Sequence, residues 1–380
     1  MDELAGNRRH ADSPPQLPLL PDDMLVEILH RLLPEPIHLF RASFVCKHWR
    51  GLVHDARFLR LFREFHGGTP PVLGFFSNQP RSPLFVPSSD AFAVPAAATM
   101  RKDDWLALDC HHGRALLLDR RDGKLLVWNP MNGDKRYLPL PTQAHLENEY
   151  TGAVLCAAGH AEHGDCHSCP FLVALTFGSW GDFITSACVY SPKTGVWGEI
   201  TPIHTNSMVD LKPAAHVGNT LYWRLDDDSI VEFDLDKNSL DLIELPDDGF
   251  GIIMLAEDGC LGFARLDRFS LHLWSRVASI DGVVSWTHRR VIDLEKLLAP
   301  QVVAACMDRV GLAGYAEDAN VIFIHVHPHT YMFHLKSMQI ERLQRGISGW
   351  FLFPYRSFYT PGPGITTGGG DDQAELLYIS

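Results

Sequence analysis

The sequence contains no run of 18 or more apolar residues, so it lacks the pattern of an ordinary membrane-spanning helix. Its first residues, MDELAGNRRHADSPPQ, have neither the apolar stretch of a signal peptide nor the acid-poor composition of a transit peptide. It has no Asn-x-Ser/Thr sequon, and its eight cysteines are spread irregularly over 380 residues. Because a chain of this size does not need disulfide staples, we expect a reducing cytoplasmic or nuclear setting and no membrane contact.

An excess of positive charge is also missing. The formal net charge is −13, whereas a general binder of nucleic acid or of anionic membranes needs a basic surface. The negative charge lies outside residues 17–66, which carry seven Lys/Arg and six Asp/Glu. A hydrophobic content of 46% and a charged content of 21% are close to globular averages, so most of the chain can bury a core.

Residues 21–66 show the period of α-helices. In PDDMLVEILHRLL the apolar residues follow one helical stripe, after a proline and two acids that suit a helix start. Pro34 and Pro36 then end this helix and begin a second one. A third short helix is expected in VCKHWRGLV and a fourth in DARFLRLFREF, where Asp55 is the predicted N-cap. The residues expected on the buried sides of the second and fourth helices are Ile37, Phe40 and Phe44, and Phe58, Leu61, Phe62 and Phe65.

Fewer than fifty residues of short helices cannot bury this much Leu, Phe and Trp alone. The remaining apolar surface packs either on the larger part of the chain or on an external partner. Residues 41–63 hold six Lys/Arg and one acid, which would also suit a helix-turn-helix reader of DNA. The acidic remainder of the chain argues against DNA, so we expect no nucleic-acid partner.

Residues 20–62, LPDDMLVEILHRLLPEPIHLFRASFVCKHWRGLVHDARFLRLF, combine a Leu-Pro start, a Cys-Lys-x-Trp-Arg core and an Asp-x-Arg-Phe-Leu-Arg ending. In this the segment closely resembles the F-box, in particular that of plant F-box proteins. Its loop LLPEPIHLF is bulkier than the common form, which leaves the register of the second helix open. The resemblance implies binding to the Skp-type adaptor of a cullin–RING (SCF) ubiquitin ligase, without a catalytic residue or a cofactor in this chain.

The resemblance also implies which residues meet the adaptor. From the first helix they are Leu20, Pro21, Leu25, Ile28, Leu29 and Leu32. Three residues of the third helix either contact the adaptor or support that face: Val45, Cys46 and Trp49. Trp49 either contacts the adaptor or holds the helices together as a core residue. Cys46 is expected to be a small buried hydrophobe, because no His and carboxylate pair nearby would activate its thiol.

Beyond residue 70 the period changes to that of strands, and an internal repeat appears. Segments 125–141, 187–202 and 229–246 align, and a degenerate copy lies at 331–343. Each copy has an aromatic residue near the end of a strand, then a small polar residue, then a Gly or Asn that suits a positive φ. The aligned residues are Trp128, Tyr190 and Phe233; Asn129, Ser191 and Asp234; and Gly133, Gly195 and Asn238.

With the hairpin that precedes it, each copy forms a unit of four short antiparallel strands, as in KPAAHV, TLYWRL, SIVEFD and SLDLIEL. Such units predict a β-propeller with about six blades, which resembles the kelch-like, F-box-associated propellers of plants in its VWNP pattern. The expected fold class is thus a two-part α+β chain, with a small all-α head before an all-β propeller. The expected parts are a disordered lead (1–16), the F-box (17–66), the propeller (70–355) and an irregular Gly-rich tail (356–380).

The densest group of metal-ligand residue types is CAAGHAEHGDCHSC at 156–169. A structural zinc site needs four convergent ligands, and Cys166-x-x-Cys169 is one suitable pair. Only five residues separate it from the other pair, Cys156-x3-His160, and a large folded domain does not need zinc to hold one loop. We therefore favour a variable surface insert without metal.

The sequence thus predicts a substrate-recognition subunit, in which the F-box binds the adaptor and propeller loops bind a protein target. Acidic residues in predicted loops would suit a basic or polar target, although a charge run is more often a solvated loop. These acids are Asp226, Asp227, Asp228, Asp247 and Asp248. Two alternatives stay open: a propeller enzyme or glycan-binding protein with an unrelated helical head, and an F-box protein that acts without target degradation.

Overall fold

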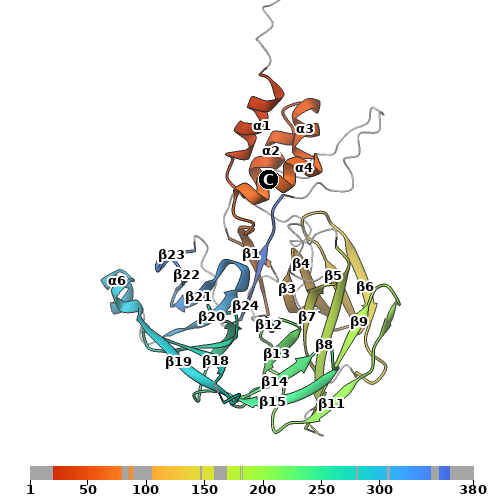
Figure 1. Ribbon diagram of the computed structural model, residues 1–380, viewed down its shortest axis with the longest axis vertical. Helices are drawn as coiled ribbons and strands as arrows, with labels where there is room; N and C mark the ends of the chain where they lie inside the picture. Colours follow the sequence, from red (N-terminus) through yellow and green to blue (C-terminus); the bar gives the residue numbers. More distant parts are fainter. Residues whose placement is uncertain are drawn as a thin grey trace, which may run out of the picture.

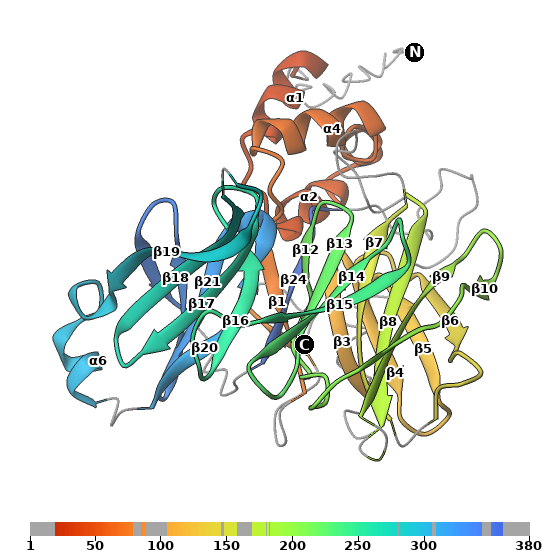
Figure 2. The same ribbon diagram turned by 60° about the horizontal axis from the view of Figure 1, so that its bottom comes forward.

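The computed structural model describes residues 20–78, 85–88, 105–145, 148–157, 169–179, 181, 183–279, 281–305, 309–343 and 351–359. A small helical head lies beside a ring of β-sheets (Figures 1 and 2), which confirms the predicted two-part fold class. Within these ranges, no helix is long and apolar enough to cross a membrane.

The head contains four helices at the predicted places. They are α1 (Asp22–His30), α2 (Pro36–Ser43), α3 (Lys47–Val53) and α4 (Ala56–Phe65). Pro21 stands at the N-cap of α1, and Pro36 is the first residue of α2, where its missing N–H leaves no bond unmade. The Asp55 carboxylate accepts the Phe58 N–H at 2.8 Å, as predicted for the N-cap of α4.

The buried sides of α2 and α4 differ in part from the predicted ones. In α2 the buried residues include Leu39 and Ala42, and in α4 the covered stripe includes Leu59 and Arg63 beside the two predicted phenylalanines. Residues predicted inside but found exposed are Phe44, Leu61 and Phe65. In so small a head, a helix is covered only where another segment packs on it. The spacing of the apolar residues alone therefore does not determine which side of the helix is buried.

The ring consists of six sheets in the described residues, and every strand pairing is antiparallel. The first sheet is β3 (Trp105–His111), β4 (Arg114–Asp119), β5 (Lys124–Trp128) and β6 (Lys135–Pro139). The second is β7 (Glu149–Cys156), β8 (Phe171–Ser179), β9 (Ile184–Ser191), β10 (Val196–Trp197) and β11 (Thr201–His204). The third is β12 (Ala215–Val217), β13 (Thr220–Arg224), β14 (Ser229–Asp234) and β15 (Ser239–Glu244).

The fourth sheet is β16 (Gly251–Leu255), β17 (Leu261–Asp267), β18 (Ser270–Ala278) and β19 (Val284–Asp293). The fifth is β20 (Val310–Ala316), β21 (Val321–Val326), β22 (His329–His334) and β23 (Gln339–Arg342), and the sixth is β1 (Val72–Ser77), β2 (Phe85–Pro87) and β24 (Leu352–Arg356). Short helices in the connections are η2 (Leu294–Lys296), α6 (Pro300–Ala305) and η3 (Glu317–Ala319).

The predicted repeat is the hairpin of the third and fourth strands of a blade. Its aromatic residues, Trp128, Tyr190 and Phe233, are buried at the ends of β5, β9 and β14. The turn residues Gly133, Gly195 and Asn238 have positive φ angles of 80°, 74° and 49°. These turns need the left-handed conformation that Gly and Asn adopt at low cost.

Strands from the two ends of the chain close the ring. β24 pairs with β1, and it also lies beside β20 and β3, the innermost strands of the neighbouring sheets. The inner strands come close here, since a Cβ added to Gly314 would lie 2.7 Å from the Leu352 carbonyl oxygen. Closure therefore fixes the start of the propeller, and with it the head that precedes it, to the last strand.

The chain continues from β24 into the head. Phe358 and Tyr359 are buried in the same core cluster as Leu29 and Phe62. The Phe358 ring meets the Phe62 ring edge-on at 6.4 Å, and the Tyr359 hydroxyl lies 2.9 Å from Nε2 of His54. The sequence predicts an irregular tail from residue 356 onward, whereas β24 ends at Arg356 and two of the next three residues, Phe358 and Tyr359, are buried in the head core.

The contact between His54 and Tyr359 predicts a pH dependence of stability. Burial, and then the charge of Arg50, lower the pKa of His54 below its usual value. The folded chain therefore favours the neutral imidazole. This contribution to stability is present above the unfolded-state pKa of about 6.5, and it is lost as the pH falls below that value toward the folded-state pKa.

We expect the urea midpoint to fall between about pH 7 and about pH 5 by more in the wild type than in His54→Gln, whose amide does not titrate. Circular dichroism at the helical minimum would follow the head. The same change of midpoint in both proteins would show that His54 does not contribute to the pH dependence.

The ring has one face toward the head and one away from it. Arg356, at the end of β24, donates its Nε–H to the Pro70 carbonyl at 3.2 Å, beside the head. The starts of two inner strands lie together at the other end of the ring. Lys212 comes shortly before β12 and Phe351 directly before β24, and the Lys212 ammonium is 4.7 Å from the centre of the Phe351 ring. The innermost strands thus begin on the face away from the head. We call the loops 205–214, 225–228 and 245–250 on that side the distal face.

Candidate functional site

The head exposes an unusually apolar surface along α1 and before α3. Met24 and Ile28 are one helical turn apart on α1, and 47% of Ile28 is exposed. A contact of 2.9 Å between Asp22 and Nε2 of His48 joins the first turns of α1 and α3, so the exposed residue before α3, Val45, belongs to the same end of the head. We call Leu20, Met24, Ile28, Phe44 and Val45 the apolar face.

The nine residues that the F-box resemblance assigned to the adaptor contact fall into three groups. Exposed residues are Leu20, Pro21, Ile28, Val45 and Cys46, and partly buried ones are Leu32 and Trp49. Leu25 and Leu29 are only 3% and 0% exposed, and they pack in the core of the head. They therefore lie beneath the apolar face and support it.

Cys46 is exposed, contrary to the expected buried position. It is the N-cap of α3, and its Sγ accepts the Trp49 N–H at 3.5 Å. A capping residue must precede the helix, which places it in the loop at the surface. Trp49 packs against the head core, in line with the alternative of a core tryptophan.

Two members of the apolar face, Met24 and Phe44, were missing from the predicted contact. A signal for Met24 was present in the sequence, since the apolar residues of α1 come in adjacent pairs such as Met24 and Leu25. One helix face cannot bury both residues of every pair, so one of each has to remain outside. Phe44 lies one residue beyond the end of α2, a boundary that periodicity does not define.

A cavity of about 290 Å³ lies within the ring, and its lining includes both Arg63 of the head and Lys212 of the distal face. Arg63 of α4 and several residues at the ends of the inner strands line it. The buried Asp109 accepts the Val154 N–H at 2.8 Å through Oδ2, and its Oδ1 is 3.8 Å from Nδ1 of His111. Nε2 of His111 is in turn 3.9 Å from Glu317. This chain of contacts links the inner strands β3 and β7 to η3, the short helix that follows β20.

Two potentially reactive groups line this cavity in unreactive forms. Burial, and then the charge of Asp109, raise the pKa of the Cys110 thiol well above its usual value, so it is not a thiolate nucleophile at neutral pH. Burial lowers the pKa of Lys212, while its ion pair of 2.5 Å with Asp210 acts in the opposite direction. The ion pair holds the Lys212 side chain against Asp210.

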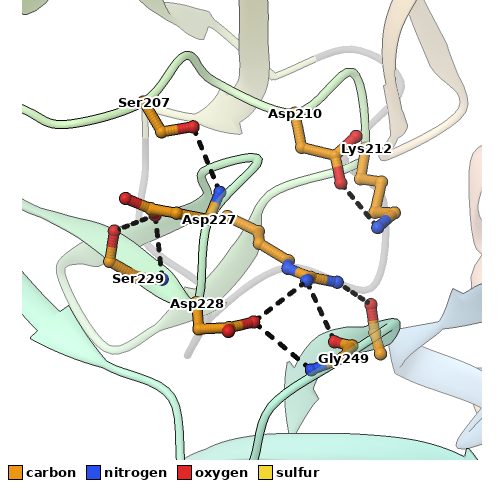
Figure 3. Close-up of polar contacts among 9 residues, drawn as sticks. Ser207, Asp210, Lys212, Asp227, Asp228, Ser229 and Gly249 are labelled. Atoms are coloured by element: carbon orange, nitrogen blue, oxygen red, sulfur yellow. Dashed lines mark hydrogen bonds and ion pairs between the residues drawn. The ribbon is translucent and has the colours of Figure 1, made fainter.

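Most of the acids that we considered for target binding are engaged within the distal face (Figure 3). Oδ1 of Asp227 accepts the Ser229 N–H at 3.1 Å, and Oδ1 of Asp228 accepts the Gly249 N–H at 3.3 Å. Asp247 forms an ion pair with Arg265. These three carboxylates hold the loops in place. The acidic residues of these loops therefore have in part a structural role.

The Cys/His segment 156–169 lies mostly outside the described residues. Of its predicted ligands the structure describes Cys156, buried at the end of β7, and Cys169. Among the described residues, no group of three or more metal-ligating side chains is close enough to hold an ion.

Two family models match the chain. One, described as F-box-like, matches residues 17–62, and the other, described as "F-box protein AT5G49610-like, beta-propeller", matches residues 107–347. The chain belongs to this second family. The head of this F-box protein is the F-box-like segment, and its ring is the propeller of the family. The description names no kelch repeat, so the kelch-like likeness stays an expectation.

A curated relative of this F-box protein is the "Putative F-box protein At3g16210" of Arabidopsis thaliana. The two are 24% identical over 188 residues, which are 47% of this chain and 46% of the relative. The chain thus spans about half the length of the relative that it matches. F-box proteins are generally non-catalytic adaptors.

Similarity to solved structures is weak. A chain of the "Crystal Structure of Mitotic Checkpoint Complex" has a TM-score of 0.35 and 10% identity, over 62% of this chain and 61% of that one. A chain of "YCF48 bound to D1 peptide" has a TM-score of 0.36 and 6% identity, over 60% and 63% of the two chains. Neither similarity says anything about what this F-box protein binds.

Proposed function

We propose that this F-box protein is the substrate-recognition subunit of an SCF-type cullin–RING ubiquitin ligase. Its head binds the Skp-type adaptor, and its propeller binds a protein target. The observation that carries the proposal is the apolar face, because it exposes five large side chains on a head matched by the F-box-like model. Figure 1 shows α1 and α3 on the side of the head away from the ring, where a partner has access.

The chemistry of the apolar face suits a stable protein partner. Removing apolar surface from water contributes about 25 cal/mol per Å², so large side chains left outside favour association. We assign the direct contact to the exposed residues and to Trp49 at the margin. Leu25 and Leu29 act from beneath, by holding α1 against the rest of the head.

The propeller then presents its loops to a target while the strands fix their positions. Ubiquitin transfer needs no catalytic group in this chain, because the complex raises the effective concentration of target lysines near a conjugating enzyme. A cytoplasmic or nuclear location agrees with this role.

The first test is binding of the intact chain to a purified Skp-type adaptor. We expect the two proteins to elute together from a size-exclusion column in equal amounts, and the complex to recruit cullin and RING subunits. Separate elution at micromolar concentrations would refute the proposal and favour a propeller enzyme or glycan-binding protein with an unrelated head.

The second test concerns degradation. Deleting the head would uncover the buried Phe358 and Tyr359, so a point variant such as Ile28→Asp is the better binding-deficient form. Proximity labelling in cells should identify the same targets with both forms, and target half-lives should lengthen with the variant. Unchanged half-lives would mean that the protein acts without target degradation.

A further inference from the structure

Phe250 is the most exposed large apolar residue in the described part of the chain. It is 88% exposed and lies in the loop between β15 and β16, on the distal face. A single exposed apolar side chain is ordinary at a protein surface. What sets Phe250 apart is the way its loop is held.

The buried guanidinium of Arg224 fixes the backbone on both sides of Phe250. Arg224 is 5% exposed, and it donates to the Gly249 carbonyl at 3.0 Å and to the Gly251 carbonyl at 3.1 Å. Figure 3 shows Asp228 beside Gly249. Oδ1 of Asp228 accepts the Gly249 N–H, and the same oxygen lies 3.8 Å from the Arg224 guanidinium. Both neighbours of Phe250 are thus anchored, while its ring projects into solvent.

Such a loop loses little conformational freedom when a partner binds. Ordering a flexible loop opposes association, and a preorganised loop avoids this cost. Aromatic residues, phenylalanine included, are enriched at protein interfaces. The geometry therefore presents Phe250 for recognition.

Exposed acidic side chains outnumber exposed basic ones around Phe250. Asp226, Asp228 and Asp248 are exposed, whereas Arg224 and Lys212 are buried, and the half-buried Arg265 is paired with Asp247. The basic groups here are thus buried or ion-paired, and the exposed charges are carboxylates. An aromatic face among carboxylates favours a cationic side chain, which can stack on the ring and bond to an acid.

We propose that the Phe250 loop is the docking point for a basic segment of the target, with a Lys or Arg side chain over the Phe250 ring. The inference rests on the proposed function, since it names the surface and the chemistry of the target. The acids that fix the loop, Asp228 above all, and the exposed Asp248 beside it supply the negative field.

The test uses the intact chain bound to the adaptor, and synthetic decapeptide pools as probes. Each pool has one central position fixed as Arg, Lys, Leu, Ser or Glu and the others random. We expect the Arg and Lys pools to bind at least about tenfold more tightly than the Glu pool, with an affinity that falls as salt is added. Equal binding of the Ser or Glu pools, or no binding of any pool, would overturn the proposal.

Substitutions locate the site. Phe250→Ala should lower the affinity of the Arg pool about tenfold, and Asp248→Asn should lower it about threefold and reduce the salt dependence. The matched control is Phe183→Ala, another exposed phenylalanine, in the loop between β8 and β9. We expect no change there, and a Phe250→Ala protein that binds like the wild type would refute the assignment.

Adaptor binding is measured on the same variants. If a variant of the Phe250 loop loses peptide binding but still binds the adaptor, the loss is specific to the Phe250 loop. If the wild type does not bind the adaptor, the proposed function itself is wrong. The two failures are therefore distinguishable.

Discussion

Replacing Phe358 with alanine should destabilise the head by about 3–5 kcal/mol, the usual cost of truncating a fully buried phenylalanine. Phe358 is 4% exposed and belongs to the head core, although it follows the last strand of the ring. A head of this size has little stability to lose, so adaptor affinity should fall with its folded fraction. Urea unfolding followed by circular dichroism at the helical minimum would measure the change.

Two further variants make this result specific. Tyr359→Phe keeps the ring but removes the hydroxyl that contacts His54, and it should cost only about 1 kcal/mol. Phe65→Ala removes a phenylalanine of the same head that is exposed, and it should change stability by less than about 0.5 kcal/mol. If Phe358→Ala were as mild as Phe65→Ala, the C-terminal segment would not be part of the head core.

The same packing makes the F-box conditional on the propeller. Phe358 reaches the head only when β24 has paired with β1, because only two residues separate Arg356, the end of β24, from Tyr359. A chain with an incomplete last blade would thus have a head with an unfilled core. If the head binds the adaptor as we propose, its affinity is expected to depend on ring closure through these few residues.

The sequence predicted the parts of this fold that repeat or that follow a period. The aligned aromatic residues and the Gly or Asn turn residues predicted the blades, because the same hairpin recurs from blade to blade. Asp55 and Pro36 gave the helix starts, since capping is a local interaction. Both kinds of signal depend on residues close together in the chain.

Contacts between distant segments could not be predicted in this way. Phe358 and Tyr359 stand before PGPG, without a period that would mark them as core, and only the closed ring brings them to His54 and Phe62. The exposed position of Cys46 follows from cap geometry, which its apolar character does not reveal.

The loop that we propose for target docking could not be predicted for a similar reason. The acids of loops 225–228 and 245–250 were visible in the sequence, but their partners were not. Asp228 and Arg224 converge on Gly249 because the loop between β13 and β14 meets the loop that leaves β15 of the same blade on the distal face. The presentation of Phe250 therefore depends on contacts with residues more than twenty positions earlier in the chain and not on its immediate neighbours alone.

Ile28→Asp should weaken adaptor binding at least about a hundredfold while leaving the chain folded. Ile28 belongs to the apolar face and is 47% exposed, so an aspartate there is solvated in the free protein. In the complex the same carboxylate would be buried without a partner, which costs several kcal/mol. Titration of labelled adaptor with the intact chain would measure the loss of affinity.

Leu33→Asp is the matched control, because Leu33 is an exposed leucine of the same head that does not belong to the apolar face. We expect it to bind the adaptor within about threefold of the wild type, since surface substitutions away from an interface change little. Equal losses in both variants would mean that the contact covers the C-terminal end of α1 as well. Wild-type affinity in Ile28→Asp, with Leu33→Asp impaired, would move the adaptor to the other side of the head and refute our assignment of the apolar face.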